Sequence, residues 1–581
     1  MRLHTSSTGL DPRSLEPGTD LVLRLDESHG VDAQEGVLAH DHLGADARRA
    51  VDDAVNPSLA AWRREFDDEL TIDGLCLAWA WEFAFVDEGW LLTIKDAAGL
   101  AAALDACAPP AIELADTDPQ TERVARAAAD AHGIPVIRAP DASAPRGAAR
   151  PTRAPLSRRA IAAASRIGLP SVVRDDSVVV RSYWHMMPLF DAMLADRSLR
   201  PAIFFTSRPA GARRSAAALA RGGLIGTPGP RTRARARRHA RRVLAALAEP
   251  PTIDVLGMPL GPALHACALR AAHARAADDL AFAAVVRRAF ARGRARTVVL
   301  PSDEDPPGRI VTAIARDAGV GSVAIQHGAV ILPRPLVEGE VADVYAIWSA
   351  AVAPPLERFP RSFRVVGYPV AHEPPPTRRI GEAPQVVVLG QGEDEHTSTM
   401  DARHRLRHYF AAVEAIATVA PRARVVLRPH HWDSDAPLRA VAERFPDVDV
   451  AVDRTSEIHD LLRRSDLCIG ASTTATYQAA LVGTPVAVLN VGCFEWPWPL
   501  GGPSAVPVAH DAEELAAQLE PWARGEVLPG RDELLLALGV TEQDVTARLL
   551  ELVTQAGSSA QAREPRAGVP VRPALVRQRE T

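Results

Sequence analysis

Residues 467–489 read LCIGASTTATYQAALVGTPVAVL. The apolar run at 467–469 predicts a buried strand, the pattern at 474–481 predicts a helix, and the apolar run at 486–489 predicts a second buried strand. A strand, a helix and a strand in close succession form a right-handed crossover unit whose two strands run parallel. The stretch therefore predicts a parallel sheet that is covered by helices on both faces.

The same alternation continues on both sides of this unit. Predicted strands at 385–389, 424–427 and 448–452 are separated by helical patterns, which predicts a Rossmann-like domain over residues 385–556. An earlier series of the same kind indicates another Rossmann-like domain over residues 175–370. The chain is therefore predicted to be an α/β protein in which the strand ends of two parallel sheets can face each other.

The remaining segments differ in composition. Residues 66–140 show a β-α-β order and a run of alternating aromatic residues, which predicts a small accessory α/β domain with an aromatic core. The aromatic residues are Trp79, Trp81, Phe83 and Phe85. The other segments are predicted to be a polar, partly disordered lead-in (1–65), a linker (141–174), a proline-rich hinge (371–384) and a disordered tail (557–581).

Composition limits the classes of function. The 581 residues, 47% hydrophobic and 24% charged, are typical of a globular protein with several domains. A net charge of −6 argues against nucleic acid as the main partner. The sequence shows no signal-peptide pattern, no apolar run long enough to span a membrane, and no C-x-x-C spacing among its five cysteines. We therefore expect a cytoplasmic protein, which leaves peripheral contact with the inner face of a membrane open.

One helical pattern is strongly basic. Residues 231–242 contain seven arginines and no acidic residue. A solvated helix face is compatible with this pattern, and so is a surface that binds an anionic acceptor or anionic lipid.

Groups suited to phosphate binding follow neighbouring predicted strands of the C-terminal domain. The hydroxyl-rich turn Ser472-Thr473-Thr474 opens a helix, whose N-terminal N–H groups and dipole favour an anion. Arg428 and His430 follow another strand of the same predicted sheet. We predict that these groups hold the diphosphate of an activated donor. The alternatives are an ion pair for Arg428, a structural role for His430, and simple N-capping by the hydroxyl turn.

Five short motifs at predicted strand ends occur in an order that resembles a known family. They are Gln326-His327-Gly328, Val366-Gly367-Tyr368-Pro369, Arg428-Pro429-His430, Ser472-Thr473-Thr474 and Gly483-Thr484-Pro485. Together they resemble the GT-B-fold transferases of bacterial surface and capsular polysaccharide biosynthesis, a group similar to polysialyltransferases and CDP-glycerol glycerophosphotransferases. The resemblance spans residues 175–550.

The resemblance implies a GT-B-like pair of domains, with the nucleotide donor in the C-terminal domain and the acceptor in the N-terminal one. It implies that His430 and the hydroxyl turn grip the donor, although His431 stands where the family pattern has proline. Related folds often place a Glu on the following helix to bind ribose, and this chain has Gln478 there. The donor-binding candidates are therefore Arg428, His430, Ser472, Thr473, Thr474 and Gln478, with Gly390 and Gly392 of the turn after the first strand of the domain.

The acceptor hydroxyl must lose a proton, so a base must face the donor. Candidates follow two strands of the N-terminal domain: Asp303, Glu304 and Asp305 after one, and His327 after the next. The acidic trio could equally be a solvated loop or a helix cap. Glu393 and Asp394 are secondary candidates from the donor side. The Asp303-Glu304-Asp305 sequence also fits a D-x-D metal pattern, but GT-B relatives usually work without a metal, so neither a metal nor a cofactor is expected.

The leading functional prediction is a metal-independent glycosyltransferase that acts in the cell envelope. Its partners would be a nucleotide-sugar donor and a glycan or lipid-linked glycan acceptor. Three alternatives remain open at this point: a CDP-glycerol-type polyol-phosphate transferase, a UDP-sugar epimerase, and a catalytically degenerate GT-B scaffold.

Overall fold

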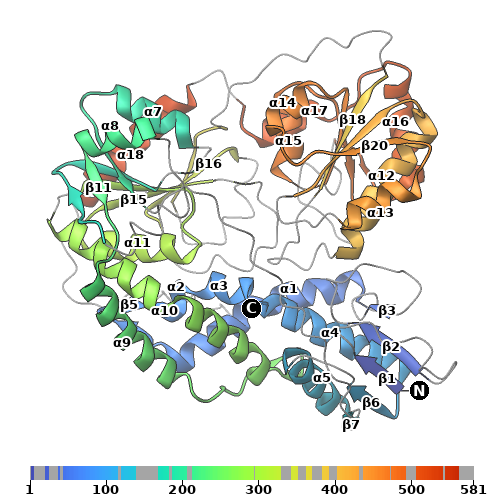
Figure 1. The fold of residues 1–581 in the computed structure, drawn as a ribbon, viewed down its shortest axis with the longest axis horizontal. Helices are drawn as coiled ribbons and strands as arrows, with labels where there is room; N and C mark the ends of the chain where they lie inside the picture. The colour runs from blue at the N-terminus through green and yellow to red at the C-terminus, as the bar shows by residue number, and fades with distance from the viewer. Residues whose placement is uncertain are drawn as a thin grey trace, which may run out of the picture.

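Three parallel sheets organise the chain in the computed structural model, and helices pack against them (Figure 1). The structure describes residues 2–5, 20–24, 37–38, 43–114, 119–138, 168–181, 183, 186–205, 212–292, 295–326, 328, 342–350, 362–368, 383–390, 402–430, 436–471, 473–491, 506–540 and 544–561. None of the helices in these ranges is both long and apolar enough to cross a membrane.

The C-terminal sheet has the strand order β20-β19-β18-β21-β22-β23, and all its neighbouring strands are parallel. Numbered along the chain, this order is 3-2-1-4-5-6, which is the doubly wound order of a Rossmann fold. The strands are β18 (Gln385–Leu389), β19 (Arg424–Arg428), β20 (Asp449–Val452), β21 (Leu467–Gly470), β22 (Val486–Leu489) and β23 (Val508–Ala509).

Helices cover this sheet on both faces because its strands are apolar on both sides. One face packs against α12 (Ala402–Val419), α13 (Ala436–Arg444) and α16 (Ala512–Ala523). The other face packs against α14 (Ile458–Arg463), α15 (Thr474–Leu481) and α17 (Arg531–Ala537). Burial on both faces explains why the strands are continuous apolar runs in the sequence.

The first Rossmann-like sheet has the order β17-β16-β15-β14-β9-β10-β11-β8. Its parallel strands again follow the doubly wound order, and β8 pairs antiparallel at one edge. The strands are β8 (Val172–Val173), β9 (Ser177–Val180), β10 (Arg200–Phe204), β11 (Gly223–Ile225), β14 (Thr297–Leu300), β15 (Gly321–Ile325), β16 (Val344–Ile347) and β17 (Ser362–Val365). Its helices are α7 (Met187–Ala195), α8 (Ala212–Arg221), α9 (Pro230–Ala246), α10 (Gly261–Arg292) and α11 (Pro306–Asp317). These two sheets confirm the predicted α/β class with a GT-B-like pair of Rossmann-like domains.

The last helix, α18 (Val545–Gln561), packs on the first sheet rather than on the domain that precedes it in sequence. Its Leu549 and Val553 are buried in one cluster with Val299 and Val323 of that sheet. Thr297 Oγ1 also donates a hydrogen bond to the Val553 carbonyl over 3.0 Å. The sequence placed residues up to 556 in the C-terminal domain, whereas this burial ties them to the first domain.

The N-terminal region contains a third parallel sheet, in the order β3-β2-β1-β6-β7. Its strands are β1 (Arg2–Thr5), β2 (Asp20–Arg24), β3 (Val37–Leu38), β6 (Ala111–Leu114) and β7 (Val136–Arg138). Three of these strands precede residue 66, so part of the predicted polar lead-in belongs to this sheet. Its longer helices are α1 (Ala45–Phe66), α4 (Trp90–Cys107) and α5 (Pro119–His132).

Three of the alternating aromatic residues lie on two short helices, α2 (Leu77–Ala80) and α3 (Glu82–Asp87), and Trp81 lies between these helices. Their rings belong to a core that also includes α10, α11 and one face of the first sheet. Trp81 Nε1 donates to Asp279 of α10 over 2.9 Å, and Trp62 Nε1 donates to His265 of the same helix over 3.1 Å. The N-terminal region is therefore continuous with the first Rossmann-like domain.

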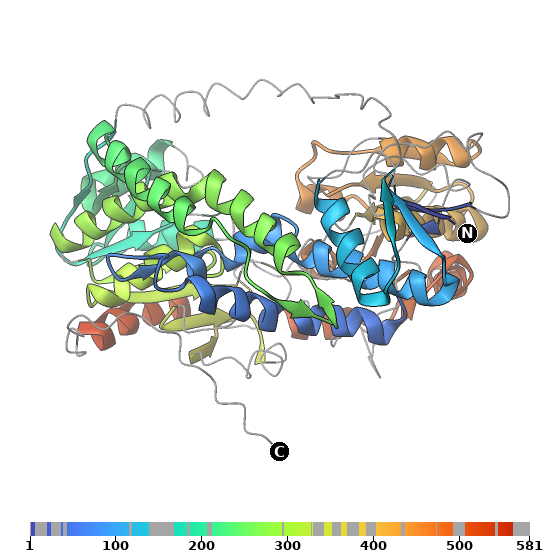
Figure 2. The same ribbon diagram turned by 90° about the horizontal axis from the view of Figure 1, so that it is seen from below.

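Two short hairpins complete the described elements: β4 (Thr71–Ile72) with β5 (Leu75–Cys76), and β12 (Asp254–Val255) with β13 (Met258–Pro259). The two Rossmann-like domains lie side by side in both views (Figures 1 and 2).

Candidate functional site

The topological switch point of the C-terminal sheet lies between β18 and β21, the first and fourth strands of the doubly wound order. Doubly wound sheets bind ligands beyond the carboxyl ends of the strands at this point. Gly390 follows β18 there, and the hydroxyl turn follows β21. Gly470 is the last residue of β21. The position has no room for a side chain, because a Cβ there would lie 2.2 Å from Thr476 Oγ1.

Thr473 is the N-cap of α15, and its Oγ1 accepts a hydrogen bond from the Ala475 N–H over 3.1 Å. Thr476 Oγ1 donates to the Ala471 carbonyl over 2.7 Å, which fixes the backbone of the turn from inside the helix. The capping alternative for this turn is therefore present at Thr473. The turn nevertheless places the start of a helix at the switch point, where the dipole favours an anion.

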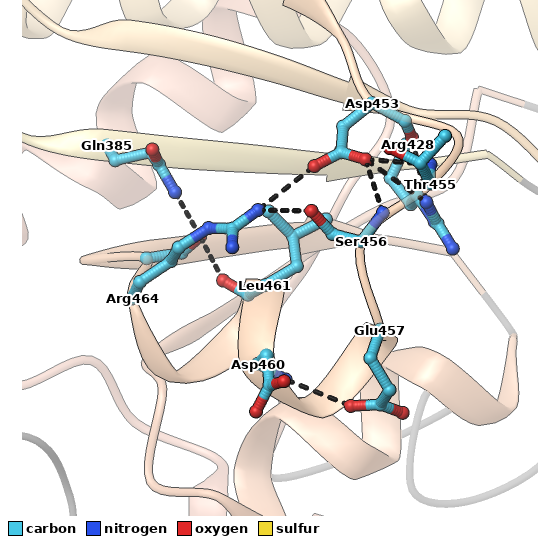
Figure 3. Close-up of polar contacts among 10 residues, drawn as sticks. Gln385, Arg428, Asp453, Thr455, Ser456, Glu457, Asp460, Leu461 and Arg464 are labelled. Atoms are coloured by element: carbon cyan, nitrogen blue, oxygen red, sulfur yellow. Dashed lines mark hydrogen bonds and ion pairs between the residues drawn. The ribbon is translucent and has the colours of Figure 1, made fainter.

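Arg428, at the carboxyl end of β19, contacts Asp453 of the neighbouring strand end (Figure 3). Its Nη1 donates to the Asp453 carbonyl over 2.9 Å and lies 3.4 Å from Asp453 Oδ1. The same carboxylate accepts from the Thr455 and Ser456 N–H groups and from Arg464. The ion-pair alternative for Arg428 is therefore present in the structure.

The surroundings of Asp453 stabilise the ionised form of its carboxyl group. Burial alone would raise the pKa of the carboxyl, but hydrogen bonds from Ser456 and Thr455 and the charge of Arg428 outweigh it and hold the pKa below its usual range. The cluster keeps Arg428 at the edge of the switch point. His430, two residues further on, is half-buried.

In the first Rossmann-like domain, the Gln326 side chain connects the segments that follow β15 and β16. Its Oε1 accepts from the Trp348 N–H over 2.9 Å, and its Nε2 donates to the Gly328 carbonyl over 2.9 Å. Trp348 Nε1 returns a hydrogen bond to the Gln326 carbonyl over 3.0 Å. In the sequence, this role is indicated only by a glutamine that directly follows an apolar strand.

The two domains meet at these strand ends. A Cβ on Gly328 would lie 3.6 Å from Thr474 Oγ1, so Gly328 lies beside the hydroxyl turn. Gln478 Nε2 donates to Tyr368 Oη over 2.7 Å, and the Tyr368 ring packs edge-on against Trp348 with 4.8 Å between ring centroids. Two segments that the sequence placed in separate domains therefore pack against each other.

Gln478, which the sequence offered as a ribose-binding residue, has a hydrogen-bond partner within the protein. The side chain is only 3% exposed, and its amide is hydrogen-bonded to the buried Tyr368 hydroxyl. Burial raises the pKa of Tyr368 to about 12, so this hydroxyl stays protonated near neutral pH. The pair joins α15 to the segment after β17.

The acidic trio lies near the switch point of the first sheet, between β9 and β14. Asp303 is fully buried and accepts the Ala342 N–H over 3.0 Å, and Glu304 is 8% exposed. Asp305 caps α11 by accepting the Gly308 N–H, and both its oxygens accept from Arg181 over 2.7 and 2.6 Å. The cap alternative is therefore present at Asp305, with an ion pair that the sequence did not indicate.

Five of the predicted residues lie outside the described residues and stay predictions. They are His327, Gly392, Glu393, Asp394 and Ser472. His327 is bracketed by Gln326 and Gly328, whose backbone positions are described. Within the described part of the chain, no group of three or more His, Cys, Asp or Glu residues is arranged to hold a metal ion.

No protein-family model matches the chain, and no curated protein matches it. Similar solved structures include a UDP-GlcNAc 2-epimerase from Neisseria meningitidis bound to UDP-GlcNAc, with 8% identity and a TM-score of 0.37 over 65% of this chain and 99% of that one. An O-GlcNAc transferase mutant from Thermobaculum terrenum has 13% identity and a TM-score of 0.32, over 89% and 95% of the two chains. The wall teichoic acid polymerase TagF has 9% identity and a TM-score of 0.35, over 67% and 91%. Likenesses this distant carry no argument about activity.

Proposed function

We propose that the chain is a glycosyltransferase that moves a sugar from a nucleotide-sugar donor to a surface-glycan acceptor. The observation that carries the proposal is the close approach of Gly328 to Thr474 at the start of α15. It brings the carboxyl ends of two doubly wound sheets together, and ligands bind at such ends. A transferase needs this arrangement because donor and acceptor must be held against each other.

In the proposed complex, the donor diphosphate lies at the start of α15. The hydroxyl groups of the turn would donate to its oxygens, and His430 would add a further donor after the end of β19. Arg428 contributes positive charge from the edge, where Asp453 fixes its position. Preorganised donors of this kind stabilise the negative charge that develops on the leaving diphosphate.

In the reaction, the acceptor oxygen forms a bond to the anomeric carbon while the bond from that carbon to the diphosphate breaks. The acceptor proton must pass to a base. We assign this role to His327, since both oxygens of Asp305 already accept from Arg181, Asp303 is fully buried and Glu304 is only 8% exposed. His327→Asn is therefore expected to lower kcat while donor affinity is retained.

Donor binding tests the proposal most directly. Thermal shifts with UDP, CDP, GDP and CMP identify the nucleotide, because a ligand at roughly 100 times its Kd stabilises a protein by ~2.7 kcal/mol. Thr474→Val removes the hydroxyl beside Gly328 while keeping the shape of the side chain. It should weaken binding of the identified nucleotide about 10-fold or more, which corresponds to one hydrogen bond to a charged group.

Thr418→Val is the matched control, because Thr418 is remote in α12 and its hydroxyl bonds only to the Glu414 carbonyl in the described structure. Equal affinity in Thr474→Val and the control would contradict the proposed donor site. If no nucleotide binds, the chain is a scaffold. If a nucleotide binds, product analysis separates the other reactions. Phosphate retained in the new linkage indicates polyol-phosphate transfer, and donor turnover without acceptor indicates epimerisation.

A further inference from the structure

Helix α9 carries a row of exposed arginines on the outside of the first domain. Its 17 residues, PRTRARARRHARRVLAA, contain seven arginines, no acidic residue and no Phe, Tyr or Trp. Arg231, Arg235, Arg238 and Arg242 follow a 4-3-4 spacing, which places them on one face of the helix, and all four are exposed. Arg237 and Arg241 are exposed beside them.

The opposite face of α9 is used for packing. Ala236, Ala240 and Val243 are buried in the core that also contains α10, and Leu247 continues the row at the end of the helix. Both views place α9 at the periphery of the molecule, against α10 (Figures 1 and 2). The apolar face is therefore unavailable for insertion into a bilayer, and only the charged face meets the surroundings.

The row has no counter-charge within the part of the chain that the structure describes. None of its six exposed arginines forms an ion pair there, whereas Arg214 of the neighbouring α8 pairs with Asp191 over 2.5 Å. Like charges at this spacing repel one another. The whole chain has a net charge of −6, so removing the +7 of α9 leaves −13 on the rest. Helix α9 is thus a local positive patch on a protein whose remaining residues carry a net negative charge.

We propose that α9 docks the protein on a membrane surface that contains anionic phospholipids. The arginines of α9 run from 231 to 242 and so present their charges along about 17 Å of a straight helix, which suits a flat array of phosphate groups. Guanidinium groups bind phosphate oxygens in pairs, and basic side chains near an anionic bilayer add up in affinity. Nucleic acid fits less well, because α9 offers no Phe, Tyr or Trp for base stacking and the rest of the chain has a net negative charge.

Vesicle co-sedimentation of the full chain tests this docking. Wild type should bind vesicles of phosphatidylcholine with phosphatidylglycerol and should not bind phosphatidylcholine alone. Arg235→Gln, Arg238→Gln and Arg242→Gln combined should reduce the partition coefficient on the order of 100-fold at low salt. Raising the salt concentration should release the wild type, since the interaction is electrostatic.

The matched control combines Arg422→Gln, Arg439→Gln and Arg444→Gln, which remove the same charge from exposed positions of the C-terminal domain. This control should bind like wild type, and both triple variants should keep the wild-type Tm because the altered side chains are exposed. An equal loss in both variants would show a net-charge effect and overturn the proposal. Absence of vesicle binding, or α9-dependent binding to a DNA duplex without vesicle binding, would also overturn it.

Discussion

At the scale of single residues, His408 combines complete burial with a titratable ring. It lies in α12, and its Nε2 is 3.2 Å from the Leu389 carbonyl at the end of β18. A neutral ring with its proton on Nε2 can donate to this carbonyl. Burial lowers the pKa of His408 to about 4, against an ordinary value of 6.5. The folded protein therefore holds this ring neutral under conditions in which the unfolded chain protonates it.

This shift predicts loss of stability in mild acid. Because the folded-state pKa is the lower one, the contribution is fully present above pH 6.5 and is lost as the pH falls towards 4. Between pH 7.5 and pH 5 the loss should be about 2 kcal/mol. His408→Gln stays neutral, so urea unfolding of this variant should lack that part of the pH dependence. The exposed His273→Gln should retain it, and equal pH dependence in wild type and His408→Gln would refute the assignment.

At the scale of elements, Asp305 ties the start of α11 to the end of β9. One carboxylate caps the helix and also pairs with Arg181. Asp305→Ala should therefore cost more than the loss of an ordinary cap, about 2–3 kcal/mol in the free energy of unfolding. Asp511→Ala removes a cap alone at α16 and should cost about 1 kcal/mol. Urea titrations compare the two, and equal losses would mean that the Arg181 pair adds nothing.

At the scale of the whole molecule, α18 joins the end of the chain to the first domain. Leu549 is 1% exposed and belongs to the core of the first sheet. Leu549→Ala should lower the free energy of unfolding by about 2–5 kcal/mol, as expected for a buried leucine. Hydrogen exchange should then accelerate in β14 and β15, although they are far from α18 in sequence.

Leu536→Ala is the control for this change, because Leu536 of α17 is 59% exposed. It should leave both stability and exchange close to wild type. Faster exchange confined to the C-terminal sheet in Leu549→Ala would show that α18 supports that sheet instead.

The sequence by itself determined the parallel sheets of the two Rossmann-like domains and the position of the hydroxyl turn. Apolar strands buried on both faces, and helices opened by hydroxyl residues, leave local patterns of a few residues. Thr473 and the ends of β18, β19 and β21 therefore lie at the sheet edge where the motifs indicated. Gly328 and Thr474 lie close together, as expected if the strand ends of the two sheets face each other.

Only the tertiary structure decided which polar residues pair with one another across the fold. Arg181 and Asp305 are 124 positions apart, and Tyr368 and Gln478 are 110 apart, so no local pattern could pair them. The same holds for α18, whose amphipathic sequence indicates a buried face but not the sheet that covers it. Pairing over such distances depends on how the strands are ordered, because that order alone brings remote side chains to one edge.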